Sequence, residues 1–329
     1  MHYEAIVIGG GAAGLSAALG LQSSGVEVLC VAPEPLPALT AAAGMLLPAL
    51  DDFSPSIQRA AHWSYAAWPE WAQSIEVADG LKDCLVRQYL GDVPSLVQQS
   101  GGRVVHTGRL YETCLGQLQL VARDRVVECE LADNEFRLTL GESKVVASKS
   151  VFWAVGYSEH LPVCHGFEIP QALVPRSVRG ITLRCRLAGL DEILYWKKDA
   201  RTVIYVAPWD DGTVVVGSTI SMDDTDQSWR ANEEQWLIQQ ARIICPGIDH
   251  AEVLERRVGL RPLGHSREPA IVQLLQSDEL RSWWINGLFR NGVLWMPACA
   301  RASAALYQGC SLEADLTGLL QLDRADSVI

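Results

Sequence analysis

Hydrophobic residues in this chain of 329 residues form short unbroken runs near the amino terminus and alternate with polar residues further along. The mainly apolar runs at 5–8, 26–31 and 150–155 predict strands of a buried sheet. The Ala- and Leu-rich run 15–21 predicts a helix between the first two strands. Strands alternating with helices in this way predict a parallel sheet with helices packed against it.

The middle of the chain has a different pattern. Alternation over 126–131 and 135–140 around Ala-Asp-Asn predicts a hairpin. A second, largely antiparallel sheet is predicted by strand-like runs at 181–187, 194–197, 203–207 and 213–218. Helices are expected over 57–75 with an interruption at Pro69, over 110–121, over 231–244 and after Pro297. Residues 80–102 show only weak periodicity.

Three tryptophans, Trp63, Trp68 and Trp71, lie within the helical region 57–75. Such a group can form a cage for a substrate or part of the hydrophobic core. We expect the core, because large aromatic side chains dominate core burial.

The glycines between the first strand and its helix follow the spacing G-x-G-x-x-G at Gly9, Gly11 and Gly14. In a strand-turn-helix unit these glycines allow a tight turn, a close approach of a pyrophosphate, and close packing of helix on strand. We therefore favour dinucleotide binding over an ordinary glycine turn. The ribose-binding acid expected at the end of the second strand is absent, since Ala32 stands there, and Glu34 is the one nearby acid. Either Glu34 reaches the ribose after a local rearrangement, or that contact is missing.

Two further stretches can contact the same ligand. Residues 40–45, which include Thr40, Ala43, Gly44 and Met45, are small or apolar and uncharged, so their backbone can approach a flat ligand closely. The alternative is the tightly packed start of a helix. The predicted strand 150–155 ends with Ala154 and Val155 and is followed by Gly156, at the carboxyl edge where ligands of parallel sheets bind.

Composition narrows the possible partners. The formal net charge of −12 argues against nucleic acid and anionic membranes, because both require basic patches. The nine cysteines show neither a C-x-x-C pair nor metal-ligand spacing, so we expect buried thiols in a reducing compartment and no metal site. The amino terminus lacks the basic region of a signal peptide, and we expect a cytoplasmic protein.

Three motifs, Ala-Ala-Gly-Met at 42–45, Gly-Leu-Arg-Pro at 259–262 and Phe-Arg-Asn-Gly at 289–292, follow the glycine motif in order. With them the chain resembles the D-amino-acid oxidase superfamily of FAD enzymes, most closely the glycine oxidase branch involved in thiamin biosynthesis. The resemblance implies an α/β fold: a Rossmann-like FAD-binding domain of the glutathione-reductase type, interleaved with a mostly antiparallel α+β substrate domain. It assigns 1–50, 101–175 and 255–329 to the FAD-binding domain, and 51–100 and 176–254 to the substrate (cap) domain.

The resemblance also implies roles for single residues. Gly9, Gly11 and Gly14 would hold the pyrophosphate of a non-covalent FAD, and Thr40, Ala43, Gly44 and Met45 would lie along the phosphates and flavin. Ala154 and Gly156 would lie near the ribityl and adenine side. Arg290, Asn291 and Gly292 would approach the pyrimidine edge of the flavin. Arg261 would pair with the substrate carboxylate, beside Tyr205 of the same pocket.

These roles imply oxidation of the C–N bond of a small amine or amino acid, with hydride transfer to flavin N5 and O2 as the expected acceptor. The segment between Ile75 and Val105 is about 40 residues shorter than the family leads us to expect, so the substrate lid is reduced. An alternative is therefore a flavoprotein that acts on a protein-bound residue or within a complex, and a protein partner or a homo-oligomer stays open. A third hypothesis is a fold that has lost tight FAD binding.

Overall fold

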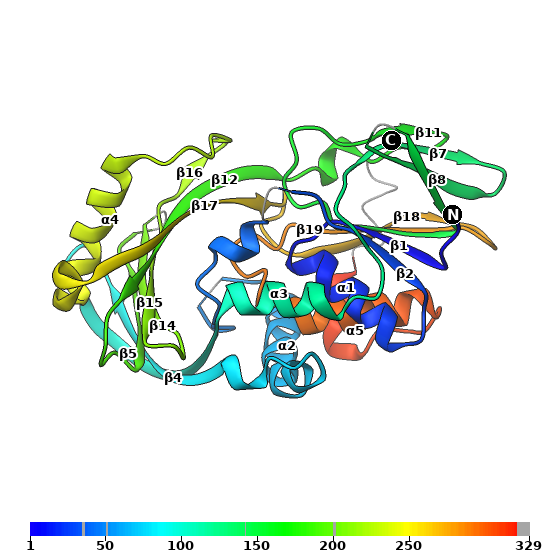
Figure 1. The fold of residues 1–329 in the computed structure, drawn as a ribbon. Helices are drawn as coiled ribbons and strands as arrows, with labels where there is room; N and C mark the ends of the chain where they lie inside the picture. Colours follow the sequence, from blue (N-terminus) through cyan, green and yellow to red (C-terminus); the bar gives the residue numbers. More distant parts are fainter. Residues whose placement is uncertain (35–36, 51, 142, 200–201, 321–329) are drawn as a thin grey trace.

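The computed structural model describes residues 1–34, 37–50, 52–141, 143–199 and 202–320, and Figure 1 shows the course of the chain. The amino-terminal strand lies inside a six-stranded sheet of order β18-β19-β10-β1-β2-β6. Its strands are β1 Ala5–Ile8, β2 Val28–Val31, β6 Val121–Ala122, β10 Ser150–Trp153, β18 Ala270–Gln276 and β19 Arg281–Asn286. Within this sheet, β19, β10, β1, β2 and β6 pair in the parallel direction, and β18 pairs with β19 in the antiparallel direction. The predicted parallel sheet is confirmed.

Alternate residues of β1 face two separate cores. Ala5 and Val7 pack among helices, whereas Ile6 and Ile8 pack against a second sheet. The helices of the first core are α1 Ala12–Ser23, α2 Pro55–Ser74, α3 Thr107–Gln117 and α5 Met296–Tyr307. The second sheet has the order β11-β7-β8-β9, with β7 Val126–Ala132, β8 Glu135–Leu140, β9 Lys144–Ser148 and β11 Val163–His165. Figure 1 shows these three layers.

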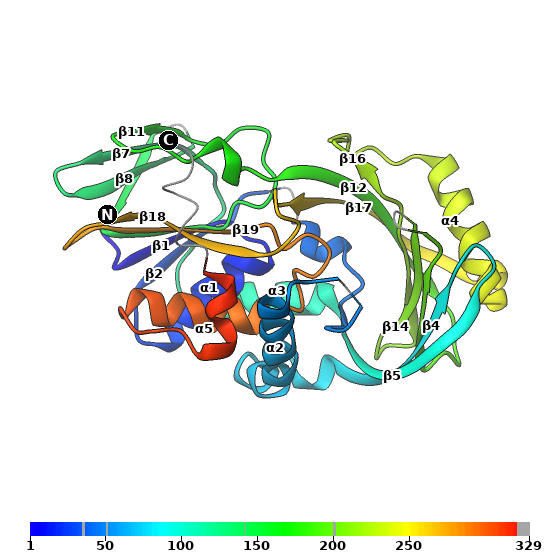
Figure 2. The same cartoon turned by 180° about the vertical axis from the view of Figure 1, so that it is seen from behind.

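A nine-stranded sheet forms the other half of the molecule, with the order β16-β12-β15-β14-β13-β4-β5-β3 and β17 paired to β12. Its strands are β3 Met45–Leu46, β4 Leu81–Leu90, β5 Ser95–Val105, β12 Arg176–Arg186, β13 Glu192–Lys197, β14 Val203–Pro208, β15 Thr213–Gly217, β16 Ser221–Met222 and β17 Glu252–Leu263. One face packs against α4 Ala231–Ile244, and the other packs against Ala43 and Leu47. Figure 2 shows β12 and β17 running from this sheet toward the six-stranded sheet. The antiparallel sheet, its four predicted strands and helix 231–244 are confirmed.

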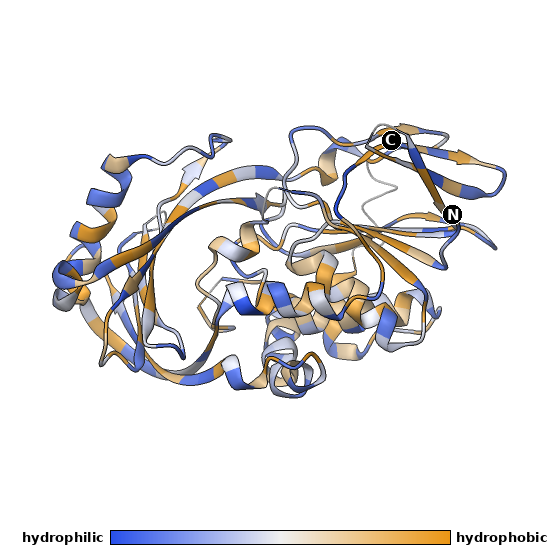
Figure 3. Cartoon of the chain, in the orientation of Figure 1, coloured by the Kyte–Doolittle hydropathy of each residue, from blue (hydrophilic) through white to orange (hydrophobic). Residues whose placement is uncertain are grey.

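The shorter helical turns connect these elements. They are the 3₁₀ helices η1 Ala38–Ala41, η2 Ala78–Gly80, η3 Gln171–Leu173, η4 Pro246–His250 and η5 Ala314–Leu319. Residues 80–102, whose periodicity is weak, form most of the β4–β5 hairpin. No helix in the described part of the chain is long and apolar enough to span a bilayer. Figure 3 shows apolar residues concentrated where α1 meets the six-stranded sheet.

The predicted interruption at Pro69 is wrong, because α2 continues through this residue. A proline inside a helix lacks the N–H that would bond the carbonyl four residues earlier. That carbonyl belongs to Tyr65, and it accepts a hydrogen bond from Nη1 of Arg103 at 2.8 Å instead. The orphaned acceptor is thus satisfied by a distant strand. Trp68 is completely buried, and Trp63 and Trp71 pack against the same core, as predicted.

The helix predicted over 110–121 ends earlier, at Gln117. Val121 and Ala122 instead form β6, which pairs with Cys30 and Val31 at the edge of the six-stranded sheet. The expected burial of the cysteines is confirmed for most of them, with Cys164 half-buried and Cys310 exposed.

The division into two interleaved domains stays a prediction. The structure adds that the boundaries placed at residues 101 and 255 fall inside continuous strands, β5 and β17. Strand β17 pairs with β12 over nearly its whole length.

Candidate functional site

A continuous cavity of about 240 Å³ extends from the amino end of α1 to the inner face of the nine-stranded sheet. Its lining comes from the turn after β1, the segment around η1, the end of β10, the strands β12–β14 and β17, and the loop after β19. Most of the predicted site residues line this cavity: Gly11, Ala43, Gly44, Met45, Ala154, Gly156, Tyr205, Arg261, Arg290, Asn291 and Gly292. Residues distant in sequence therefore meet in one site.

Two glycines of the turn after β1, Gly9 and Gly14, have no room for a side chain. A Cβ on Gly9, whose φ is +130°, would lie 2.1 Å from the carbonyl oxygen of Ala154. A Cβ on Gly14 would lie 1.8 Å from the carbonyl oxygen of Gly9. These two glycines pack the turn and do not line the cavity, whereas Gly11 does.

The amino end of α1 presents unbonded backbone donors to the cavity. Gly11 is its N-cap and provides no side chain to satisfy the first N–H groups, and the first turn has no acid. Free N–H groups and the positive end of the helix dipole favour an anionic ligand such as a phosphate. Together with the glycine packing, this turn fits the pyrophosphate of a dinucleotide.

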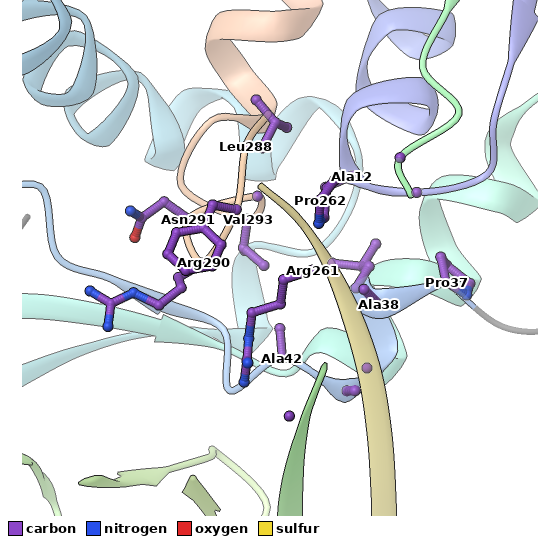
Figure 4. Close-up of a pocket in the computed structure, with 18 of the residues that line it drawn as sticks. Ala12, Pro37, Ala38, Ala42, Arg261, Pro262, Leu288, Arg290, Asn291 and Val293 are labelled. Carbon is purple, nitrogen blue, oxygen red and sulfur yellow. The ribbon is translucent and has the colours of Figure 1, made fainter. Parts of the chain in front are cut away.

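Arg261 extends from the end of β17 into the cavity, as Figure 4 shows. Its Nη1 donates to the carbonyl oxygen of Thr219 at 3.2 Å. A Cβ on Gly180 would lie 2.2 Å from Nη1 and 2.4 Å from Nη2 of Arg261. The glycine in β12 therefore makes the space that the guanidinium occupies.

Tyr205 lies on the same inner face, in β14. A Cβ on Gly217 would lie 2.2 Å from its hydroxyl oxygen, so a second strand glycine admits the phenol ring. Burial raises the pKa of Tyr205, although Arg261 and a hydrogen bond with Ser218 oppose the shift. Tyr205 is therefore a neutral phenol near pH 7.

The loop after β19 brings a second guanidinium, that of Arg290, to the cavity (Figure 4). The backbone N–H of Phe289 donates to the carbonyl oxygen of Pro262 at 3.1 Å, which joins this loop to the end of β17. Burial lowers the pKa of Arg261, Tyr205 opposes this, and the charge of Arg290 lowers it further. The two arginines are thus close enough to repel each other. Among the lining residues that the structure describes, none is acidic.

Two further predicted site residues, besides Gly9 and Gly14, lie outside the lining. Glu34 is exposed, so its contact with a ribose stays a prediction. The hydroxyl of Thr40 donates to the carbonyl oxygen of Pro37 at 2.9 Å and closes the turn of η1. Ala41 and Leu39, its neighbours on either side, line the cavity instead.

Several lining residues were not predicted from the sequence, among them Tyr157, Tyr195, Ser218, Asn286 and Phe289. Tyr195 in β13 lies directly opposite Tyr205 in β14, so the strand alternation could have placed it on the inner face. The glycines inside β12 and β15 were a second signal, because a strand glycine often marks a close approach. Nothing in the local sequence indicates Tyr157 or Asn286.

The cavity fits FAD at the pyrophosphate end because of the glycine turn and α1. It fits at the flavin end because small residues of the η1 segment and a pair of arginines line the same cavity. In such a site Gly11 and the amino end of α1 would hold the pyrophosphate. Ala43, Gly44 and Met45 would lie along the ring.

Comparisons with known proteins identify related families and folds. The family model described as FAD dependent oxidoreductase matches residues 4–104 and 95–306. The glycine oxidase of Bacillus licheniformis is 27% identical over 124 residues, which are 38% of this chain and 33% of that protein. The D-amino-acid oxidase of Rubrobacter xylanophilus is 27% identical over 283 residues, 79% of this chain and 82% of that relative. The match to the Bacillus enzyme thus spans only a third of its length.

Solved structures share the fold across the whole chain. The glycine oxidase from Geobacillus kaustophilus has a TM-score of 0.81 at 18% identity, covering 98% of this chain and 99% of that one. The iminodiacetate oxidase from Chelativorans sp. has a TM-score of 0.77 at 20% identity, covering 94% and 96%. These likenesses establish the α/β architecture and say nothing more about the substrate.

Proposed function

The chain belongs to the family of FAD-dependent oxidoreductases, and from this premise we propose that it oxidises the C–N bond of a small amine that carries a carboxylate. The observation that carries the proposal is the guanidinium of Arg261, which lies in the cavity with no acidic residue among the described lining. A carboxylate is the group that such a site selects, because it neutralises the buried positive charge.

Arg261 would hold the substrate carboxylate through parallel charge-assisted hydrogen bonds, which fix both the position and the orientation of the α-carbon. Tyr205 is a neutral phenol beside it and can donate a further hydrogen bond. The second guanidinium, at Arg290, adds positive potential to the same pocket. These side chains bind and orient, which lowers the entropy cost of reaching the reactive geometry.

Bound FAD supplies the two-electron oxidation that turns the amine into an imine, which water then hydrolyses. Because the cofactor carries this step, the proposal requires no protein general base, and the lining offers no carboxylate for that role. The resemblance to glycine oxidase supports glycine, sarcosine and D-amino acids as first candidates, with O2 as the acceptor and the FAD held non-covalently.

Anaerobic mixing of the FAD-loaded protein with glycine, sarcosine and a panel of D-amino acids tests the proposal. The flavin absorbance near the visible maximum should bleach with at least one of them and return with peroxide formation when O2 is admitted. The variant Arg261→Gln, which keeps a polar side chain without the charge, should retain FAD and lose bleaching at low substrate concentration. Bleaching by none of these amines would refute the proposal.

A second candidate is oxidation of an amine carried on another protein. The observation that favours it is the β4–β5 hairpin, which carries exposed apolar side chains at Leu85, Val93, Leu96 and Val97. Rapid turnover of a free small amine would exclude this as the main activity. Failure of free amines, together with co-purification of a partner that bleaches the flavin, would favour it.

A further inference from the structure

Four consecutive backbone carbonyls of the segment 40–43 each accept a hydrogen bond from a different side chain. We name the four donors the carbonyl clamp. They are Arg257 Nη1 to the oxygen of Thr40 at 2.9 Å, Thr182 Oγ1 to that of Ala41 at 2.8 Å, Thr107 Oγ1 to that of Ala42 at 2.9 Å, and Trp209 Nε1 to that of Ala43 at 2.9 Å. The donors come from β17, β12, α3 and the residue after β14.

The clamp decides where the backbone N–H groups of this segment point. In a planar trans peptide, the carbonyl of one residue and the N–H of the next lie on opposite sides. Each N–H group of 41–44 therefore points away from the donor that holds the carbonyl of the same peptide. The N–H of Ala42 donates to the carbonyl oxygen of Leu39 at 3.1 Å, within η1. Ala43 and Gly44 follow it and line the cavity.

Three of the four clamp residues are buried, and Arg257 is half-buried. Thr107 and Thr182 are 0% and 2% exposed, and Trp209 is 2% exposed. The Trp209 ring packs against His106, with the ring centres 3.7 Å apart and the ring planes tilted by 32°. The guanidinium of Arg257 lies 5.1 Å from the same indole ring. A buried donor that lost its carbonyl would remain unsatisfied, so the segment has little freedom to rotate.

We propose that the carbonyl clamp positions the N–H groups of Ala43 and Gly44 toward the bound flavin, where they stabilise the negative charge that the ring gains on reduction. Fixed N–H dipoles that need no reorganisation are an effective way to stabilise such charge. Thr107, Thr182, Trp209 and Arg257 are thus positioning residues that act through the backbone of 40–44. The proposal rests on FAD binding and is independent of which substrate is oxidised.

Trp209→Phe tests the proposal, because it removes the Nε1 donor and keeps an aromatic ring against His106. Thr182→Val and Thr107→Val remove single hydroxyl donors with little change in shape. The matched control is Trp196→Phe: Trp196 is equally buried and its Nε1 donates to the carbonyl oxygen of Gly91 at 2.8 Å, on the opposite face of the sheet.

The readout is the two-electron reduction potential of the bound FAD, together with the dissociation constant of oxidised FAD. Each clamp variant should lower the preference for reduced over oxidised flavin about tenfold, a shift of about 30 mV to more negative potentials for a two-electron couple. Trp196→Phe should leave the potential unchanged.

The proposal is wrong if the threonine variants bind FAD with the parental potential, or if Trp196→Phe shifts it as much as Trp209→Phe does. Loss of folding in Trp209→Phe alone would leave the decision to the threonine variants. Absence of amine oxidation would contradict the proposed function and would leave this measurement unaffected.

Discussion

Gly180→Ala is the smallest change that should displace the substrate-binding guanidinium. Its new Cβ would lie 2.2 Å from Arg261 Nη1 and 2.5 Å from the carbonyl oxygen of Thr219, which accepts from the same Nη1. The φ angle of Gly180 lies outside the left-handed region, so alanine fits the backbone. The conflict therefore falls on the Arg261 side chain and its acceptor.

The magnitude follows from the hydrogen bonds that a displaced guanidinium gives up. A hydrogen bond to a charged group contributes about 1.5–3 kcal/mol, so losing one of a parallel pair weakens carboxylate binding roughly 10- to 150-fold. Overpacking costs about 1–3 kcal/mol of folding free energy. Replacing glycine by alanine also restricts the unfolded chain, which stabilises the folded protein by about 0.4–1 kcal/mol. The variant should therefore fold, with moderately reduced stability and a large loss of binding.

Acetate is a suitable probe, because it presents a carboxylate and has no oxidisable amine. Titration into the FAD-loaded protein, followed by the change in the visible flavin spectrum, gives its dissociation constant, and urea unfolding gives the stability. The matched control is Gly101→Ala: Gly101 also lies in a strand, β5, and a Cβ there meets nothing within 4 Å. This control should bind acetate as the parent does.

Parental acetate affinity in a folded Gly180→Ala protein would refute the assignment of Arg261 as the carboxylate-binding residue. An equal loss in Gly101→Ala would show that the assay reports a general effect of alanine in these strands. Unchanged FAD content in both variants separates the carboxylate site from the cofactor site.

Two further predictions concern the cofactor turn and pH. In Gly14→Ala the new Cβ would lie 1.8 Å from the carbonyl oxygen of Gly9, so we expect protein largely free of FAD and a lower melting temperature, measured by the ratio of flavin to protein absorbance and by thermal unfolding. Burial lowers the pKa of His106, while Asp211 opposes the shift, so the unfolded chain binds protons more readily at this residue. The free energy of unfolding should therefore fall as the pH drops below about 6.5, which is the pKa of His106 in the unfolded chain. Above that pH, His106 should cause no further change in the free energy of unfolding. Urea unfolding between pH 5 and 8 should show a smaller slope for His106→Asn, which keeps an acceptor for the N–H of Arg109. An unchanged slope would contradict the assignment.

The sequence predicts those parts of the site that are formed by residues close together in the chain. The G-x-G-x-x-G turn needs only a strand, three glycines and a helix, all within residues 5–23, and it forms where predicted. Strand alternation likewise places the antiparallel sheet. The continuity of α2 through Pro69 could not be foreseen, because the carbonyl it orphans is satisfied by Arg103 from a strand that lies 38 residues away from Tyr65.

Contacts between distant elements account for the rest. The family resemblance implies a place for Thr40 along the phosphates and flavin, and in the structure its hydroxyl closes the η1 turn. The indole of Trp209 holds the carbonyl of Ala43, 166 residues earlier. No local pattern marks such a pair, since the donor follows β14, the acceptor precedes β3, and the two meet only when the nine-stranded sheet has formed.

The alternation of β17 explains why cofactor and substrate residues depend on one another. Residues 257, 259 and 261 share one face of this strand, because side chains alternate with a period of two. Arg257 holds the carbonyl of Thr40, Gly259 leaves room for Ala41, whose Cβ would lie 3.0 Å from an added Cβ, and Arg261 reaches the cavity.

The partner strand β12 has a matching order. Thr182, which donates to Ala41, lies opposite Arg257, and Gly180, which makes space for Arg261, lies opposite Gly259. A shift of one residue in this register would turn the donors, the glycines and the substrate arginine away from the cavity together. The pairing of β12 with β17 therefore sets the distance between the segment that cradles the ring and the side chain that holds the carboxylate, and neither can be moved alone.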